Sequence, residues 1–350
     1  MAPPHTLIFR HPEGPRPAFP VRPVFLPNAG CPGKCIYCVQ EVQTGRAALA
    51  LGDIYEHLRR ELDRAAAAAH APFELGFYGG TFTALPEDYA ARFVALAAAY
   101  KQGGPVAAVR CSTRPDAAGL PLLRELAALG LDSVELGGQS FDDAALAASR
   151  RGYDGAAARA ACEAVREAGL NLGVQLLPGL PSLPSLPGHA PEAFRRDIEI
   201  LLEIKPGLVR LYPCLVIEGS ALAAMHDRGE YAPWPLETAA SEIARALPPL
   251  WRAGVRVARL GLAPQPGLLG KIKAGPWHAS LGSLTRGRAL YAMLAQSLDG
   301  RRMNALRLPR RYQGELFGFG GELIEPYARL GLKTANAKPW DQAHFALETA

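Results

Sequence analysis

The chain has 350 residues, of which 49% are hydrophobic and 20% are charged, and its formal net charge is +5. This composition is that of an ordinary globular protein and excludes disordered and fibrous classes. No run approaches the roughly 18 consecutive apolar residues of a membrane helix, and the proline-rich N-terminus has no apolar signal-peptide core. We therefore expect a cytoplasmic protein that does not enter a membrane.

Strand-like segments alternate with helical ones from near residue 20 to near residue 230. The expected strands cover Val21–Leu26, Phe73–Tyr78, Ala107–Cys111, Ser133–Leu136, Asn171–Leu177 and Leu208–Tyr212. The expected helices cover Asp53–Ala69, Pro86–Tyr100, Leu120–Leu129, Ala156–Ala168 and Pro191–Ile204. Such alternation indicates a parallel sheet with right-handed crossovers. Six units are too few to close an eight-fold barrel, so the sequence predicts an α/β fold with an open, partial (β/α)6 barrel.

The remainder of the chain is less regular. We expect an N-terminal extension over residues 1–20, the barrel over 21–232 and a C-terminal extension over 233–350. The last contains a predicted helix (Leu236–Ala253), a strand (Arg256–Leu260), a glycine-rich loop and a helix (Ser283–Leu298). No separate fold can be assigned to this extension from its sequence.

Basic residues gather in that extension. Between Trp251 and Arg311 there are twelve Lys and Arg residues and a single acidic residue, Asp299. Such an asymmetry is typical of a basic face suited to a polyanion such as RNA. The alternative is an ordinary solvated surface in an arginine-rich protein.

Three of the six cysteines lie within eight residues, as Cys31-Pro-Gly-Lys-Cys35-Ile-Tyr-Cys38. Three thiolates at this spacing can ligate three irons of a [4Fe–4S] cluster and leave the fourth iron open. The amino and carboxylate groups of S-adenosylmethionine (SAM) can chelate that iron, and one-electron reduction then cleaves SAM to a 5′-deoxyadenosyl radical. A structural zinc site needs a fourth ligand, which the loop lacks. We expect Cys31, Cys35 and Cys38 to be the metal ligands and the centre of catalysis.

This cysteine run, with an aromatic residue directly before its last cysteine, resembles the radical SAM superfamily. Further matching segments follow the predicted strands: Gly79-Gly80-Thr81, Gly138-Gln139-Ser140 and Gln175–Pro181. One branch, that of the Elongator catalytic subunit, shares additional segments: Phe77–Phe82, Ser112–Asp116, Val134–Ser140, Arg151-Gly152 and Leu211–Gly219. The run Pro23–Asn28 and the segment Gly275–His278 resemble a shorter bacterial group of that branch. The chain differs from the Elongator subunit in the closer spacing of its first two cluster cysteines.

The resemblance implies modification of tRNA or another RNA, and a reductant such as flavodoxin or ferredoxin. Together with their chemistry, it assigns SAM contacts to Tyr37, Gly79, Gly80, Thr81, Arg114, Glu135, Gln139, Ser140, Gln175 and Arg210. Arg114 can instead pair with Asp116, and a buried Glu135 or Arg210 can belong to an ion pair. The last 120 or so residues contain no clear glycine-rich acetyl-CoA loop, so the acetyltransferase domain of the Elongator subunit is not expected.

Two other functions remain open at this point. A radical SAM enzyme acting on a small molecule or peptide would have a closed pocket over the cluster and basic residues scattered over several faces. A non-catalytic iron–sulfur or zinc protein would supply a fourth protein ligand and would not turn over SAM. An RNA-modifying enzyme would instead show one basic face leading to the barrel mouth.

Overall fold

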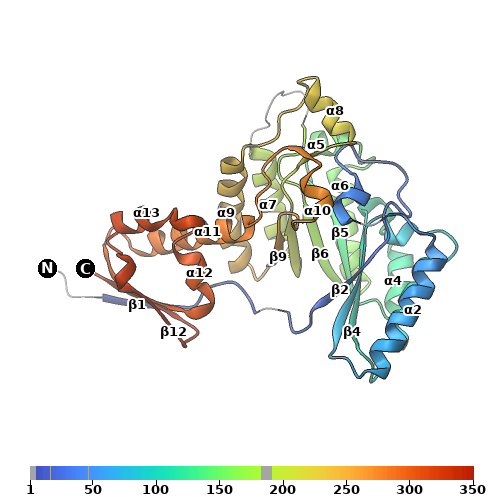
Figure 1. Ribbon diagram of the computed structural model, residues 1–350, viewed down its shortest axis with the longest axis horizontal. Helices are drawn as coiled ribbons and strands as arrows, with labels where there is room; N and C mark the ends of the chain where they lie inside the picture. Colours follow the sequence, from blue (N-terminus) through green and yellow to red (C-terminus); the bar gives the residue numbers. More distant parts are fainter. Residues whose placement is uncertain (1–4, 16, 46, 183–190) are drawn as a thin grey trace.

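The computed structural model describes residues 5–15, 17–45, 47–182 and 191–350. It has two lobes (Figure 1). The larger contains a curved parallel sheet with helices along its outer side, and the smaller contains both ends of the chain. No helix among the described residues is both long and apolar enough to cross a membrane.

The sheet of the larger lobe is an open half-barrel of parallel strands, which confirms the predicted fold class. In the described chain it contains seven strands in the order β2-β3-β4-β5-β6-β7-β9. Their bounds are β2 Val21–Phe25, β3 Phe73–Tyr78, β4 Val106–Thr113, β5 Ser133–Gln139, β6 Asn171–Leu176, β7 Leu208–Leu211 and β9 Arg256–Leu260. One strand more than expected is present, because β9 pairs with β7. The sheet therefore continues past residue 232, where we placed the end of the barrel.

Helices follow the strands as the alternation predicted. The longer ones are α2 Leu51–Ala67, α3 Tyr89–Ala99, α4 Leu120–Ala128, α6 Gly155–Glu167, α7 Glu192–Ile204 and α9 Leu236–Arg252. Each buries an apolar stripe, such as Ile54, Leu58 and Leu62 of α2, because residues three and four apart share one helix face. Helix α9 is the crossover from β7 to β9. This helix and the strand after it were both predicted, but the irregular segment before them led us to place them outside the barrel.

Shorter elements lie at the carboxyl ends of the strands. They are α1 Gln40–Thr44, α5 Asp143–Ala148, α8 Ala221–Asp227, α10 Pro266–Leu269 and the antiparallel pair β8 Val216–Ile217 with β10 Ile272–Ala274. Short 3₁₀ turns cover Phe82–Ala84 and Pro115–Ala117 in this lobe, and Arg310–Tyr312, Phe319–Gly321 and Thr334–Asn336 in the other. Helix α10 contacts α1, so the segment after β9 reaches across to the segment after β2.

The barrel stays open because β2 and β9 are edge strands. Pro23 lies in the middle of β2, where a residue without an amide hydrogen is tolerated only at a sheet edge. The central strands β3 and β5 are almost wholly buried, whereas β2 and β9 are partly exposed. The segment before β2 passes this opening on its way from the smaller lobe (Figure 1).

The smaller lobe is built from parts of both expected extensions, the N-terminal one and the C-terminal one. Its sheet has the order β1-β13-β11-β12, with β1 His5–Phe9, β11 Met303–Pro309, β12 Ala337–Trp340 and β13 Phe345–Thr349. Strand β1 pairs with β13, so the first residues of the chain fold with the last. Helices α11 Leu281–Ser297, α12 Gln313–Leu316 and α13 Ile324–Arg329 belong to the same lobe.

Helix α11 connects the two hydrophobic cores. Leu284 and Met293 pack into the core of the half-barrel, while Leu290 and Leu294 pack into that of the smaller lobe. Gly287 lies between them, and a Cβ at this position would be 2.6 Å from the carbonyl oxygen of Glu315. The α11–α12 contact therefore requires a glycine here.

Replacing Gly287 with alanine is expected to lower the free energy of unfolding by about 1–3 kcal/mol, because the added methyl group overpacks this contact. The matched control is Gly282→Ala in the same helix, where a Cβ would meet nothing closer than 3.9 Å. That control should be neutral, or more stable by up to about 1 kcal/mol from helix propensity. Urea denaturation measures both, and equal stability of the two variants would contradict the close contact.

Candidate active site

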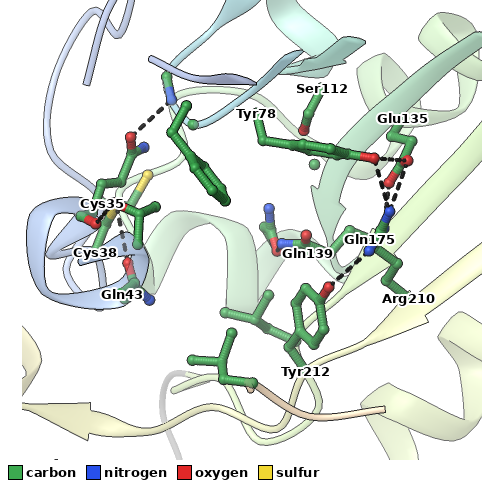
Figure 2. A pocket seen from close by; sticks show the side chains of 18 of the residues that line it. Cys35, Cys38, Gln43, Tyr78, Ser112, Glu135, Gln139, Gln175, Arg210 and Tyr212 are labelled. Carbon is green, nitrogen blue, oxygen red and sulfur yellow. Dashed lines mark hydrogen bonds and ion pairs between the residues drawn. The ribbon is translucent and has the colours of Figure 1, made fainter. Parts of the chain in front are cut away.

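A cavity of about 680 Å³ occupies the interior of the half-barrel and opens at the carboxyl ends of its strands. Figure 2 shows Cys35 and Cys38 on one side of it, and Tyr78, Glu135 and Arg210 on the other. Most of the predicted site residues line it: Cys31, Cys35, Tyr37, Cys38, Gly79, Gly80, Arg114, Glu135, Gln139, Gln175 and Arg210. Thr81 and Ser140 are buried but are not among the lining residues.

The cysteine loop leaves β2 and is held against the end of β3. Gly80 has a φ of +68°, and a Cβ there would overlap the carbonyl oxygen of Ala29. The side-chain oxygen of Gln40 accepts hydrogen bonds from the backbone amides of Asn28, at 2.6 Å, and Gly80, at 2.8 Å. The glycine pair is thus required by the close approach of the cysteine loop, in addition to any role toward a ligand.

Cationic side chains surround the middle cysteine. Nη1 of Arg151 donates to the Sγ atom of Cys35 at 3.0 Å and to the hydroxyl of Tyr37 at 3.2 Å. Nη1 of Arg114 lies 3.8 Å from the same sulfur. Two guanidinium groups beside one sulfur can balance the negative charge of a thiolate ligand and of a group bound to it. The surroundings of Cys35 therefore suit a metal-ligating cysteine.

The outer two cysteines have different surroundings. The Sγ atom of Cys31 is 3.3 Å from the hydroxyl of Thr81. Burial, with the neighbouring Cys35, raises the pKa of Cys38 to about 11. Among the described residues, no three His, Cys, Asp or Glu side chains converge closely enough to hold a single metal ion.

Arg114 also forms the structural ion pair that its sequence context allowed. Its guanidinium donates to both carboxylate oxygens of Asp116, at 2.9 and 2.7 Å, and to the carbonyl oxygen of Arg151. Asp116 thereby orients Arg114 toward the cysteine loop.

Glu135 lies at the centre of a buried polar network inside the barrel. Its carboxylate accepts hydrogen bonds from the Tyr78 hydroxyl at 3.0 Å, from Arg110 at 2.8 Å and from Arg210 at 3.0 Å. Burial acts to raise the pKa of Glu135, but the two guanidinium groups outweigh it and hold this pKa below its usual range. Arg110 pairs also with Glu74, and Arg210 donates to the hydroxyl of Tyr212 at 3.2 Å.

The loop after β5 is set by a second buried carboxylate. Gln139 faces the cavity with a φ of +67°, and its side-chain oxygen accepts a hydrogen bond from Gln175 at 3.2 Å. The next residue, Ser140, donates to Asp197 at 2.8 Å, and the amide of Phe141 donates to the same carboxylate at 2.7 Å. The hydrogen bonds of Ser140 and Phe141 to Asp197 therefore hold the preceding residue, Gln139, in position.

Sequence reasoning missed several residues that build this site. They are Gln40, Tyr78, Arg110, Arg151 and Asp197. Tyr78 and Arg151 both lay in segments matched to the Elongator branch, which was a usable signal. Arg110 and Asp197 lie within apolar strand and helix patterns, where a charge should have indicated a buried partner.

Several cations of the basic segment between Trp251 and Arg311 are paired with acidic residues. Five of its cations form ion pairs, with N–O distances of 2.5 to 2.8 Å: Lys271 with Glu218, Lys273 with Asp227, Arg286 with Glu13, Arg288 with Glu237 and Arg310 with Asp341. The excess of positive charge seen in the local sequence is thus partly cancelled by acids from elsewhere in the chain.

Replacing Glu135 with glutamine should lower the free energy of unfolding by about 3–5 kcal/mol, because it leaves buried guanidinium groups without their counter-charge. The control is Glu167→Gln, which breaks the exposed pair of Glu167 with Arg124 and should cost no more than about 1 kcal/mol. Denaturant titration at neutral pH compares them. A cost for Glu135→Gln as small as the control's would show that the network is not a stabilising element.

Asp197 predicts a pH dependence of stability. Burial raises its pKa from 3.8 to about 7, so between these two pH values the folded state binds the proton more tightly than the unfolded state. This carboxyl therefore makes the free energy of unfolding fall as the pH rises from about 4 to about 7, by at most about 1.4 kcal/mol per pH unit. Asp197→Asn should flatten that decline. Parallel stability profiles for the variant and the parent chain would contradict the assignment.

The sequence profile of the radical SAM superfamily matches residues 25–184, and that of a radical SAM C-terminal domain matches residues 206–289. The tRNA uridine(34) acetyltransferase of Methanocaldococcus jannaschii is 28% identical over 270 residues, which are 65% of this chain and 49% of that protein. Elongator complex protein 3 of Danio rerio is 28% identical over 282 residues, 72% of this chain and 48% of its own length. The chain thus spans about half the length of these curated relatives.

Among solved structures, the archaeal Elp3 of Methanocaldococcus infernus superposes with a TM-score of 0.59 and 23% sequence identity, over 80% of this chain and 63% of that one. This likeness concerns the fold. The superfamily profile begins at the end of β2, spans the cysteine loop and runs past β6, and the C-terminal profile continues through β7 and β9. The chain therefore belongs to the radical SAM superfamily, whose members in general use a [4Fe–4S] cluster and SAM.

Proposed function

We propose that this chain is a radical SAM enzyme that modifies tRNA. The observation that carries the proposal is the position of Cys31, Cys35 and Cys38. All three line one cavity at the carboxyl ends of the strands of a half-barrel, where barrel folds of this kind bind their ligands.

The residues present fit a [4Fe–4S] cluster held by these three cysteines. Three thiols are the donor set that such a cluster takes, and the guanidinium groups of Arg114 and Arg151 lie beside Cys35 to balance anionic charge. Each thiolate binds a different iron, so the three sulfurs need not converge on one point. When bound, the cluster and SAM supply reductive cleavage of SAM to a 5′-deoxyadenosyl radical.

The chain itself supplies position and shielding. Gly79 and Gly80, beside the cysteine loop, line the cavity, and backbone carbonyl oxygens in this segment are the kind of acceptor that the amino group of SAM requires. The paired amides of Gln139 and Gln175 are placed to bind hydroxyl or ring nitrogen groups. Tyr37 packs in the apolar cluster beneath the cysteine loop and excludes water from it.

Glu135 and Arg210 take a different part in this proposal from the one we expected. Their hydrogen-bonding groups are largely used by each other, by Arg110 and by Tyr78. We infer that they hold the inner wall of the cavity and orient Tyr78 and Tyr212 toward the substrate. Any contact they make with SAM would be secondary to that role.

The tRNA part of the proposal rests on the relatives. Their names are those of tRNA uridine(34) acetyltransferases and Elongator complex proteins, and the shared region contains the radical SAM core. The acyl-transfer step in those names is not proposed for this chain, since its matches to them cover about half of their length.

A second candidate is a radical SAM enzyme acting on a small molecule. The ion pairs of the C-terminal basic segment favour it, because Lys271, Lys273 and Arg288 are engaged by acidic partners. Cations that are engaged by the protein's own acids are less available to bind the phosphates of an RNA.

The test is an anaerobic assay of SAM cleavage. Protein reconstituted with iron and sulfide is mixed with SAM and dithionite, and 5′-deoxyadenosine is measured by mass spectrometry with and without bulk tRNA. We expect product from the parent chain, more product when tRNA is present, and a loss of at least about 100-fold in Cys35→Ala. The matched control is Cys162→Ala, which alters a buried cysteine of α6 outside the cavity.

Absence of 5′-deoxyadenosine from protein that carries the cluster would refute the radical SAM reaction. Product that does not respond to tRNA would instead favour the small-molecule candidate. Equal losses in Cys35→Ala and Cys162→Ala would point to a general effect of cysteine removal on the fold.

A further inference from the structure

A second, smaller cavity of about 280 Å³ lies at the open side of the half-barrel. Its walls come from three places: the segment before β2, the start of β9, and the smaller lobe. The lining residues include Arg256, Arg286 and Arg311, together with Glu13 and Glu315. Five of the eleven lining residues are thus charged, although the side cavity lies away from the cysteine loop.

The side cavity and the main cavity share a wall. Pro17, Arg256 and Ala258 line both of them. Arg256 is the first residue of β9, so it lies at the amino ends of the strands, whereas the cysteine loop lies at their carboxyl ends. The main cavity therefore extends along the barrel from the cysteines to Arg256.

Arg256 differs from the other two arginines of the side cavity. Arg286 forms an ion pair with Glu13 at 2.5 Å, and Arg311 donates to the hydroxyl of Tyr312 and lies over its ring. Arg256 is half-buried, and no ion pair or hydrogen bond joins its side chain to another described residue. Burial, and then the cation of Arg110, lower the pKa of Arg256, while the carboxylates of Glu74 and Glu135 act in the opposite direction without outweighing them.

A half-buried guanidinium without an acceptor is costly, because its five donors lose water without gaining a partner. The nearby carboxylates of Glu74 and Glu135 already form ion pairs with Arg110 and Arg210. Nothing in the surrounding packing therefore accounts for a cation at position 256. Its planar fork matches a carboxylate or phosphate group, which it can bind through two parallel hydrogen bonds.

We propose that Arg256 binds the acidic group of a small organic anion that enters the barrel through the side cavity. The ligand class is a carboxylate- or phosphate-bearing molecule of few atoms, because a space of about 280 Å³ is smaller than most drug-sized pockets. The anion would lie at the opposite end of the barrel from the cysteine loop, with the rest of the molecule directed toward Arg210 and Tyr212. This site goes beyond the proposed function, since binding there needs neither SAM nor a reductant.

The test measures binding without turnover. The full chain with its reconstituted cluster is titrated anaerobically with acetate, propionate or inorganic phosphate, with sodium chloride matched for ionic strength. Thermal unfolding and calorimetry report binding. The variants are Arg256→Gln and, as the matched control, Arg252→Gln. Arg252 is an exposed arginine at the end of α9, four positions away, with no ion-pair partner among the described residues.

We expect at least one of the organic or phosphate anions to raise the melting temperature of the parent chain above the chloride control. Arg256→Gln should weaken that binding at least about tenfold, while Arg252→Gln should leave it unchanged. In the absence of anion, Arg256→Gln should melt no lower than the parent chain, because the substitution removes a half-buried charge whose burial is its largest unfavourable effect. A tighter response to phosphate assigns a phosphate-bearing ligand, and a tighter response to acetate or propionate assigns a carboxylate.

Two results would overturn the proposal. One is that no anion stabilises the parent chain beyond chloride, and the other is that Arg256→Gln binds the anions as well as the parent does. If Arg256→Gln does not fold, Arg256→Lys is the second variant, because it keeps the positive charge but removes the planar guanidinium group. It should bind the anion more weakly than the parent chain. Because SAM and dithionite are absent, failure here is distinct from failure of SAM cleavage.

Discussion

The half-barrel depends on one buried carboxylate. Glu135 of β5 accepts hydrogen bonds from side chains of β3, β4 and β7 at once, through Tyr78, Arg110 and Arg210. An open sheet of parallel strands with an apolar interior would tend to fill its own centre, because burying apolar surface is favourable. A paired and hydrogen-bonded polar network resists that collapse, since every member would lose its partners. The cavity therefore remains open along its length, with a rigid polar wall facing the cysteine loop.

The cysteine loop is likewise held in place by a small number of side chains. Gln40 accepts from the amides of Asn28 and Gly80, so one side chain joins the two ends of the loop to β3. Arg151 and Arg114 approach Cys35 from the segments after β5 and β4. The loop is thereby fixed by contacts from several strands, and a change in any of these strands is transmitted to the position of the thiols. Radical chemistry requires such fixed geometry, because a reactive intermediate must meet only its intended target.

The sequence was informative where local pattern and chemistry coincide. Alternating strands and helices predicted the half-barrel, and the spacing of Cys31, Cys35 and Cys38 predicted a site at the carboxyl ends of its strands. The strand Arg256–Leu260 was predicted but assigned to the C-terminal extension, because the segment between β7 and α9 has no regular period, and its pairing with β7 was missed. The pairing of β1 with β13 joins residues more than 330 positions apart, which no local pattern reports. The acid that engages Arg286 is likewise distant, at Glu13, so the local charge of the C-terminal segment overstated its exposed positive surface.

The proposed function depends above all on three cysteines that hold a [4Fe–4S] cluster whose open iron binds SAM. Electron paramagnetic resonance of the anaerobically reduced protein, recorded before and after SAM is added, tests this most directly. We expect the signal of a reduced [4Fe–4S] cluster whose shape changes when SAM binds, and loss of that cluster in Cys31→Ala, Cys35→Ala or Cys38→Ala. A cluster signal that is indifferent to SAM, or one that survives removal of any of these cysteines, would contradict it.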